Sequence, residues 1–190
     1  GVISIGCGAF WKCNSLSSIV IPKSVKKMKG NPFMCWNGKL KVFSTMFTYV
    51  GGVLFDKKRQ KILSCQNNEV SYTIPSGVTS IGEGAFENCK SLLSIILPNS
   101  VTSIGDKAFC NCSSLKDIVL PNGLTNIGDS TFSGCKSLLS IILPNSVTNI
   151  GNCAFLNCSS LRNIVLPNGL TNLGDSTFSG CKSLLSIILP

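Results

Sequence analysis

The chain has 190 residues, of which 44% are hydrophobic and 13% are charged, and its formal net charge is +9. This composition supplies enough apolar surface for a folded core and excludes a disordered chain. No run of ~18 uninterrupted apolar residues occurs, so no membrane-spanning helix is expected.

The repeat pattern is irregular in the first 76 residues. Residues 2–24 form one repeat, and residues 25–43 form a degraded second copy. Residues 44–76 break the period. There, Val53–Phe55 and Ile62–Leu63 flank a polar run, which predicts a β-hairpin with a charged tip. Eleven of the Lys and Arg residues lie in this front part, against Asp56 and Glu69.

From residue 77 the chain repeats regularly. Five successive copies share Val or Leu at positions 78, 101, 124, 147 and 170, so the period is 23 residues. A fixed period of ~20–50 residues indicates a solenoid. We therefore expect one leucine-rich repeat domain over residues 1–190. It comprises two repeats in 1–43, a hairpin insertion in 44–76, and five regular repeats in 77–190, the last truncated. The chain opens and stops inside a repeat, which predicts a piece of a longer array.

Each repeat contains two segments with different periodicities. The segment Leu115-x-x-Ile118-x-Leu120 has alternation typical of a strand. In the other segment, Ile104, Ala108 and Cys112 are spaced by four, which predicts a short helical or 3₁₀ turn. Gly105 is expected to take a positive φ at the entry to this turn. The predicted fold is an α/β solenoid. It is a right-handed leucine-rich superhelix with a parallel sheet on the concave face and short helical turns or short strands on the convex face.

Stacking of these repeats places equivalent residues above one another, because neighbouring strands lie ~4.8 Å apart. Two inward ladders follow. The phenylalanine ladder comprises Phe10, Phe86, Phe109, Phe132, Phe155 and Phe178. The cysteine ladder comprises Cys13, Cys89, Cys112, Cys135, Cys158 and Cys181, which we interpret as buried, reduced thiols. The more exposed thiols are expected at Cys7, Cys110 and Cys153.

The recurring motif IGxxAFxxCxSLxxIxLP resembles the 23-residue repeats of BspA-like bacterial and protist surface proteins. The segment GGVLFDKKRQKIL is similar to an insert common in that family. The resemblance implies a leucine-rich repeat surface protein, secreted or at the cell surface, that acts as an antigen or adhesin. It also implies partners such as host matrix or plasma proteins.

The sequence gives little support for a catalytic site. The chain contains no histidine, which removes the usual general base. Its carboxylates fall singly on repeat turns, and the glycines follow the repeat instead of a nucleotide-binding pattern. We therefore expect no enzyme activity, no cofactor and no metal site. Specific nucleic-acid binding is not expected either.

The solvent side of the predicted sheet is the candidate binding surface, because contiguous exposed apolar residues often mark an interaction site. Alternatively, β-branched residues there merely suit a strand. The candidate residues are Val20, Leu93, Ile96, Lys116, Asp117, Val119, Leu139, Ile142, Arg162, Asn163, Val165, Leu185 and Ile188.

A second candidate surface is the basic hairpin tip, which would attract an anionic glycan or simply solubilise the protein. It comprises Lys57, Lys58, Arg59 and Lys61. Two other functions remain open for the whole chain: a structural spacer rod and an intracellular scaffold.

The most recent duplication copied a pair of repeats. Residues 101–144 and 147–190 differ at seven positions, and the inward-facing residues are unchanged apart from Ile127 and Leu173. This pattern predicts an array that grows in 46-residue steps while its surface drifts.

Overall fold

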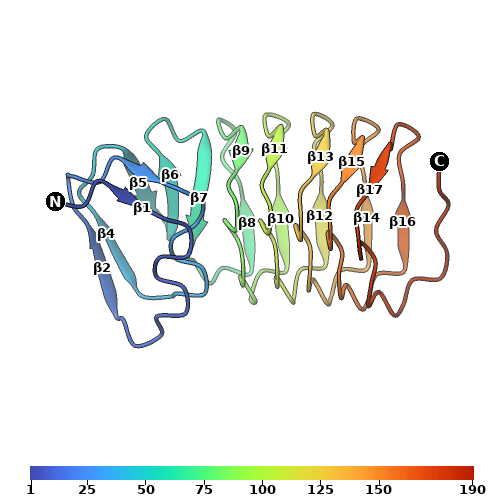
Figure 1. The fold of residues 1–190 in the computed structure, drawn as a ribbon, viewed down its shortest axis with the longest axis horizontal. Helices are drawn as coiled ribbons and strands as arrows, with labels where there is room; N and C mark the ends of the chain where they lie inside the picture. The colour runs from blue at the N-terminus through green and yellow to red at the C-terminus, as the bar shows by residue number, and fades with distance from the viewer.

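The computed structural model describes residues 1–190 and contains seventeen short β-strands and no helix. The chain winds into coils that lie side by side, and its two termini lie at opposite ends of the molecule (Figure 1). The predicted solenoid is therefore confirmed, whereas the α/β description with helical turns is wrong.

One side of the regular array carries a row of parallel strands, which form a three-stranded and a two-stranded sheet. Its strands are β8 (Ser71–Thr73), β10 (Ser94–Ile96), β12 (Asp117–Val119), β14 (Ser140–Ile142) and β16 (Asn163–Val165). Residues 23 positions apart are paired, as in Ser94 with Asp117. We call the outward surface of these strands the sheet face. The segment 184–189 adopts no strand, although the repeat predicts one.

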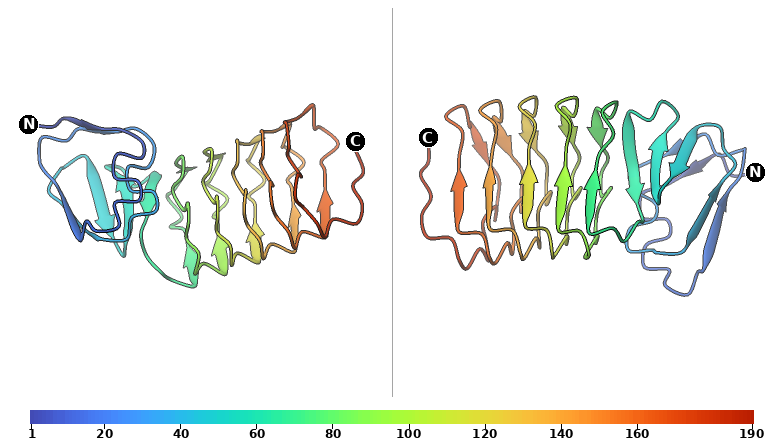
Figure 2. Two further views of the ribbon diagram at one scale, coloured as in Figure 1. Left: turned by 60° about the horizontal axis from the view of Figure 1, so that its bottom comes forward. Right: turned by 180° about the vertical axis from the view of Figure 1, so that it is seen from behind.

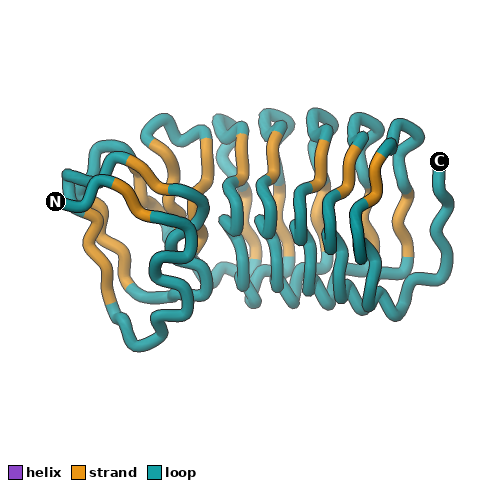
Figure 3. The backbone as a smooth tube through the Cα atoms, in the orientation of Figure 1, coloured by secondary structure: helices purple, strands orange, loops and turns teal.

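The opposite side carries a second row of parallel two-residue strands, which belong to two separate ladders. The strands are β9 (Ser80–Ile81), β11 (Ser103–Ile104), β13 (Asn126–Ile127), β15 (Asn149–Ile150) and β17 (Asn172–Leu173). Short strands were one of the two structures predicted for this side, and the tube in Figure 3 shows them joined by turns.

The turn between these strands cannot be a helix, because its N–H groups alternate between two directions. Lys107, Phe109 and Asn111 donate to carbonyl oxygens of the next coil at 2.8, 2.9 and 2.7 Å. The residues between them donate to the carbonyl three positions back in their own coil. Lys107 and Asn111 take φ values of 56° and 58°, which interrupts any right-handed helical run.

The expected positive φ of Gly105 is also wrong. Instead, a Cβ at Gly105 would lie 2.7 Å from the backbone nitrogen of Glu83 in the preceding coil. Glycine is required here because two backbones approach closely, which is another reason for its use in tight structures.

The array is nearly straight, with its coils in one row (Figures 1 and 2), so the sheet face is not the inner wall of a horseshoe. Helices are wider than strands, and a solenoid with helices on one side bends toward the other. Here both sides are hydrogen-bonded from coil to coil, and strand spacing is the same on each side. The absence of helices thus explains the absence of strong curvature.

The N-terminal 43 residues form two coils with their own small sheets. β1 (Ser4–Ile5) pairs with β3 (Lys27–Met28), and β2 (Ser18–Ile21) pairs with β4 (Lys39–Val42). Phe10 and Phe33 stack with ring centroids 5.6 Å apart. The degraded second repeat therefore stacks on the first, as its register predicts.

The insertion is a three-stranded antiparallel meander. It comprises β5 (Phe47–Val50), β6 (Val53–Asp56) and β7 (Lys61–Cys65), and β7 continues in parallel to β9. The predicted hairpin is the β6–β7 pair. Alternate residues of β6 and β7 point to opposite faces of the meander. The meander therefore lies between two hydrophobic cores.

The larger core holds 35 buried residues and includes Val53, Phe55 and Ile62 from the meander. The smaller core holds nine and includes Leu54 and Leu63. The predicted phenylalanine ladder runs through the larger core from Phe86 to Phe178, with successive centroids 5.3–5.6 Å apart, whereas Phe10 packs against the smaller core and does not join it. One coil cannot bury these rings alone, so its stability depends on its neighbours.

Candidate interaction surfaces

The sheet face presents a row of β-branched apolar side chains to solvent. In β10, β12, β14 and β16 the central isoleucine points into the core and its neighbours point out, as in β12, where Ile118 is buried and Val119 is 78% exposed. Strand alternation therefore places the row where the sequence predicts it. Its members in the array are Ile96, Val119, Ile142, Val165 and Ile188, and we call them the apolar row.

A second outward row flanks the apolar row and alternates between leucine and a basic residue. It comprises Leu93, Lys116, Leu139, Arg162 and Leu185, all exposed. The polar positions Asp117 and Asn163 are exposed beside it, so the face has an apolar centre and a mixed margin. This arrangement is typical of interaction surfaces, which combine an apolar centre with a polar rim.

Val20 does not belong to this continuous row. It lies in β2, pairs with Lys41 of β4, and these strands form a sheet separate from β8, β10 and β12. The sequence predicts that Val20 extends the row because the repeat position is the same. The meander inserted between the two parts interrupts the sheet, so the extension is not made.

The sheet face is also divided within the array. β10 pairs with β12 and β14 pairs with β16, whereas no ladder joins β12 to β14. β8 also pairs with β10, so the strands on this side form a three-stranded sheet, β8–β10–β12, and a two-stranded sheet, β14–β16.

The basic hairpin tip is exposed as predicted. Lys57, Lys58, Arg59 and Lys61 all face solvent. Asp56 fixes the tip, because its Oδ1 accepts hydrogen bonds from the backbone N–H groups of Gln60 and Lys61 at 2.7 and 2.9 Å. The tip belongs to the sheet of β5, β6, β7, β9 and β11, so the two candidate surfaces lie on different sheets.

All eleven cysteines are free thiols. Of the six ladder thiols expected to be buried, three are buried and three are only half-buried, namely Cys13, Cys89 and Cys181. From Cys112 onward each ladder thiol donates to the phenylalanine carbonyl of the preceding coil, as Cys135 does to Phe109 at 3.2 Å. Burial raises the pKa of Cys135 to about 12 and that of Cys112 well above its usual range. The thiols therefore join coils as weak hydrogen-bond donors and are poor nucleophiles.

The three cysteines predicted to be exposed differ from one another. Cys7 is exposed, whereas Cys110 and Cys153 are half-buried between coils. Burial raises the pKa of Cys110 to about 11, and the Glu87 carboxylate adds to the rise. The turn that carries these cysteines packs between the preceding coil and the following one. Aligning the repeats does not reveal this burial.

No group of three or more His, Cys, Asp or Glu side chains in the chain could hold a metal ion. The structure has no helix of the length and apolarity needed to cross a membrane. The turn carboxylates serve the backbone instead: Asp106 Oδ1 accepts from the N–H of Asp129 at 2.9 Å, and Asp129 Oδ1 accepts from that of Asn152 at 2.7 Å.

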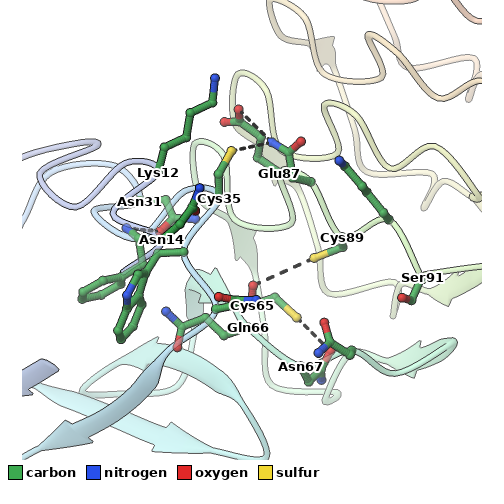
Figure 4. Close-up of a pocket in the computed structure, with 16 residues that line it drawn as sticks. Lys12, Asn14, Asn31, Cys35, Cys65, Gln66, Asn67, Glu87, Cys89 and Ser91 are labelled. Carbon is green, nitrogen blue, oxygen red and sulfur yellow. Dashed lines mark hydrogen bonds between the residues drawn. The ribbon is translucent and has the colours of Figure 1, made fainter. Parts of the chain in front are cut away.

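Two surface features escaped sequence reasoning. Lys39 and Lys41 point outward from β4, and the ammonium of Lys41 lies 4.8 Å from the ring centre of the exposed Phe43. Alternation in the segment KLKV is a signal that could have revealed them. The second feature is a cavity of about 430 Å³ between the N-terminal coils and the array (Figure 4). It depends on the packing of three segments that no periodicity connects.

The stacked coils, with leucine-rich strands on one side and a phenylalanine ladder inside, define a leucine-rich repeat solenoid. The profile of the BspA-type leucine-rich repeat region matches residues 1–68 and 59–185, in six copies. The chain therefore belongs to the BspA-type leucine-rich repeat family. Repeat proteins of this class generally act as protein-interaction modules, and their fold is typically non-catalytic.

Solved structures agree with this assignment. A leucine-rich cell surface protein from Faecalibacterium prausnitzii is 33% identical, with a TM-score of 0.88 over 98% of this chain and 51% of that one. The pneumococcal vaccine antigen PcpA is 27% identical, with a TM-score of 0.80 over 98% and 48%. The Treponema pallidum leucine-rich repeat protein is 33% identical, with a TM-score of 0.65 over 77% and 70%.

The chain spans about half the length of the first of these structures. Among curated proteins, none matches the chain.

Proposed function

We propose that the chain is a non-catalytic adhesion module of a cell-surface or secreted protein, which binds a host or matrix protein through its sheet face. The observation that carries this proposal is the apolar row, whose members Val119, Ile142 and Val165 are 78%, 76% and 67% exposed. These three side chains lie in the interior of the array, so their exposure does not arise from an end.

The free energy available supports the proposal. Covering an exposed Val or Ile side chain contributes roughly 1.5–3 kcal/mol before the cost of association. A row of such residues, rimmed by Lys116 and Arg162, can therefore support a stable protein contact with charge selectivity at its margin. The surface location is supported by the solved relatives, one named as a cell surface protein and another as a vaccine antigen.

The test replaces Val119, Ile142 and Val165 together by threonine, which keeps the β-branched shape and removes apolar surface. Binding to a panel of immobilised extracellular-matrix and plasma proteins is measured by surface plasmon resonance. We expect the unmodified chain to bind at least one member and the triple variant to bind it at least ~10-fold more weakly, since a loss of ~1.4 kcal/mol is tenfold.

A matched control replaces Val2 and Val50, which are also exposed but lie outside the array. This control should bind as the unmodified chain does. Equal binding by the triple variant would contradict the proposal. Failure of the unmodified chain to bind any protein in the panel would instead favour a spacer rod, a function that the straight stack of coils also suits.

A further inference from the structure

The outward side of the N-terminal sheet carries two positive charges without a carboxylate partner. Alternate residues of β4 point to solvent, and two of them, Lys39 and Lys41, are exposed lysines. The chain has no Asp or Glu before Asp56, and the Oδ1 of Asp56 accepts two hydrogen bonds from the backbone of the hairpin tip. Neither ammonium group therefore meets a carboxylate within the N-terminal coils.

Apolar side chains lie beside these lysines on the same side of the sheet. Val20 of β2 is paired with Lys41 and is 53% exposed, and Phe43, two residues after Lys41, is 48% exposed. Phe43 continues the extended path of the strand, since its N–H donates to the Ile21 carbonyl at 2.8 Å. This surface combines positive charge with apolar area. We call Val20, Lys39, Lys41 and Phe43 the β4 face.

The β4 face is separate from the sheet face of the array. Figure 1 shows β2 and β4 side by side at the N-terminal end of the molecule, and the two strands form a sheet of their own. A partner bound to the β4 face is therefore independent of the function proposed for the sheet face.

The β4 face is held in place before any partner binds. Trp36 Nε1 donates to the Leu16 carbonyl at 2.7 Å, which fixes the segment before β4 against the first coil. The ammonium of Lys41 lies 4.8 Å from the ring centre of Phe43, and this cation–π contact restricts a lysine side chain that is otherwise mobile. Less conformational entropy is then lost when a partner orders these side chains.

The spacing of the two lysines indicates the class of partner. Residues two apart in a strand are separated by roughly 6.6 Å along its axis, because each residue advances ~3.3 Å. An extended peptide has the same repeat, so carboxylates at alternate positions of such a peptide can face Lys39 and Lys41 together. The next alternate position of the peptide then faces Phe43 and Val20, where an apolar side chain is favoured.

A polyanion matches the β4 face less well. Its affinity rises with the number of cations that it contacts, and this face offers two. A polyanion without apolar groups would also leave Val20 and Phe43 in water. A polypeptide can place acidic and apolar side chains next to each other, so it can cover both parts of the face.

We propose that the β4 face binds an extended acidic segment of a partner protein. Two carboxylates at alternate positions of that segment pair with Lys39 and Lys41, and the following alternate side chain is apolar and covers Phe43 and Val20.

The test uses short fluorescent peptides as probes. In each probe glutamate alternates with serine in the first half, and leucine, valine or phenylalanine alternates with serine in the second half. Anisotropy titration of the whole chain should show saturable binding of at least one probe, with a Kd below roughly 1 mM. Added salt should weaken this binding, because it screens exposed charges. A probe of the same composition with consecutive glutamates should bind at least ~3-fold more weakly, since it loses the alternate spacing.

Two variants test the two parts of the face. Lys39→Gln combined with Lys41→Gln should weaken probe binding at least ~5-fold, because both ion pairs are lost. Phe43→Ser should weaken it at least ~3-fold, because apolar contact is lost. The matched control is Lys27→Gln combined with Lys29→Gln, which removes the same charge at β3, in the other sheet of the same coils, and should bind as the parent does. These side chains are exposed or half-exposed, so equal melting temperatures would show that the fold is intact.

Saturable binding that depends on Lys39, Lys41 and Phe43 supports the proposal. Absence of saturable binding by every probe overturns it, as does equal binding by the Lys39 and Lys41 double variant. If heparin binds through these two lysines and no peptide does, the face is a site for an anionic glycan and the proposal is wrong. The sheet-face triple threonine variant should bind the probes as the parent does, and loss of probe binding there would place the peptide on the sheet face instead.

Discussion

The glycine that opens each turn sets the distance between two coils. At Gly151 a Cβ would contact Oδ1 of Asp129 and lie 2.8 Å from its backbone nitrogen, and Gly174 is equally crowded by Asn152. The same aspartate oxygen accepts the N–H of Asn152. A side chain at this position would therefore separate the backbones and break the hydrogen bond that joins them.

Gly151→Ala is predicted to lower the free energy of unfolding by about 1–3 kcal/mol, the range for overpacking a close contact. Urea denaturation followed by circular dichroism measures the change. Gly77→Ala is the matched control, because its Cβ would meet nothing within 4 Å and its φ is not positive. That variant should be neutral or slightly stabilised through the unfolded state. Equal effects at both positions would disprove the coil-spacing role.

Cysteine reactivity should follow burial in the ladder. With a pKa of about 12, Cys135 has a thiolate fraction near 1 in 10⁴ at about pH 8. Partial burial and the Glu83 carboxylate raise the pKa of Cys7 too, but its thiol is exposed, so we predict that a thiol-reactive disulfide reagent modifies it before the buried ladder thiols. The buried Cys112, Cys135 and Cys158 should react only after denaturation. Mass spectrometry of the labelled peptides measures the order.

A Cys7→Ser variant is the control for this experiment, because it should remove the fast phase and leave the rest unchanged. Rapid labelling of Cys135 in the folded protein would contradict the buried ladder.

Sequence reasoning was most reliable where a residue repeats at a fixed offset. Phe109, Cys135 and Ile118 could be placed in the core because stacking puts identical residues above one another. The positive φ expected at Gly105 was wrong because the sequence shows only that glycine is required, and backbone approach requires it as strictly as φ does. Close approach depends on the neighbouring coil, which is not local in the sequence.

The turn of each coil shows why the four-residue spacing of its inward residues wrongly predicted a helix. Ile104, Ala108 and Cys112 do point inward, as a helical turn would place them. Alternating N–H directions and a positive φ at Lys107 give the same inward stripe without a helix. Inward periodicity therefore identifies which residues are buried but not how their backbone is hydrogen-bonded.

The meander is the element with the clearest charge. Replacing Lys57, Lys58, Arg59 and Lys61 by glutamine is predicted to lower the salt concentration at which the protein elutes from heparin, because exposed charges attract polyanions over a Debye length of ~10 Å at 0.1 M salt. Asp56 is unchanged and continues to fix the tip. The fold should therefore be intact.

Replacement of the four N-terminal lysines Lys23, Lys26, Lys27 and Lys29 is the control of equal charge. If both variants elute alike, net charge and not the tip governs retention. Unchanged elution of the tip variant would end the glycan hypothesis for this hairpin.

The whole molecule contains two cores that share one wall. Val53 contributes to the larger core and Leu54 to the smaller one, although the two residues are adjacent in β6. We predict that Val53→Ala accelerates amide hydrogen exchange mainly in residues 78–150, whereas Leu54→Ala accelerates it mainly in residues 1–43. Each should cost about 1–4 kcal/mol locally, since both side chains are fully buried.

Exchange followed by mass spectrometry separates these regions, and each variant serves as the control for the other. Identical exchange patterns would show that the chain unfolds as one unit. The sequence predicted the insertion and its charged tip, but not its place between two cores. That place depends on which face of β6 meets which coil, and both faces of this strand are apolar.

The straight stack has a consequence for how such a protein can evolve. Because both sides of a coil advance by one strand spacing, a duplicated 46-residue pair adds roughly 10 Å of length and little bend. Recombination between identical pairs would then change the reach of the molecule in fixed increments, and every increment would carry another copy of the same outward side chains. The length of the array and the number of its outward contact residues would therefore rise together in a lineage.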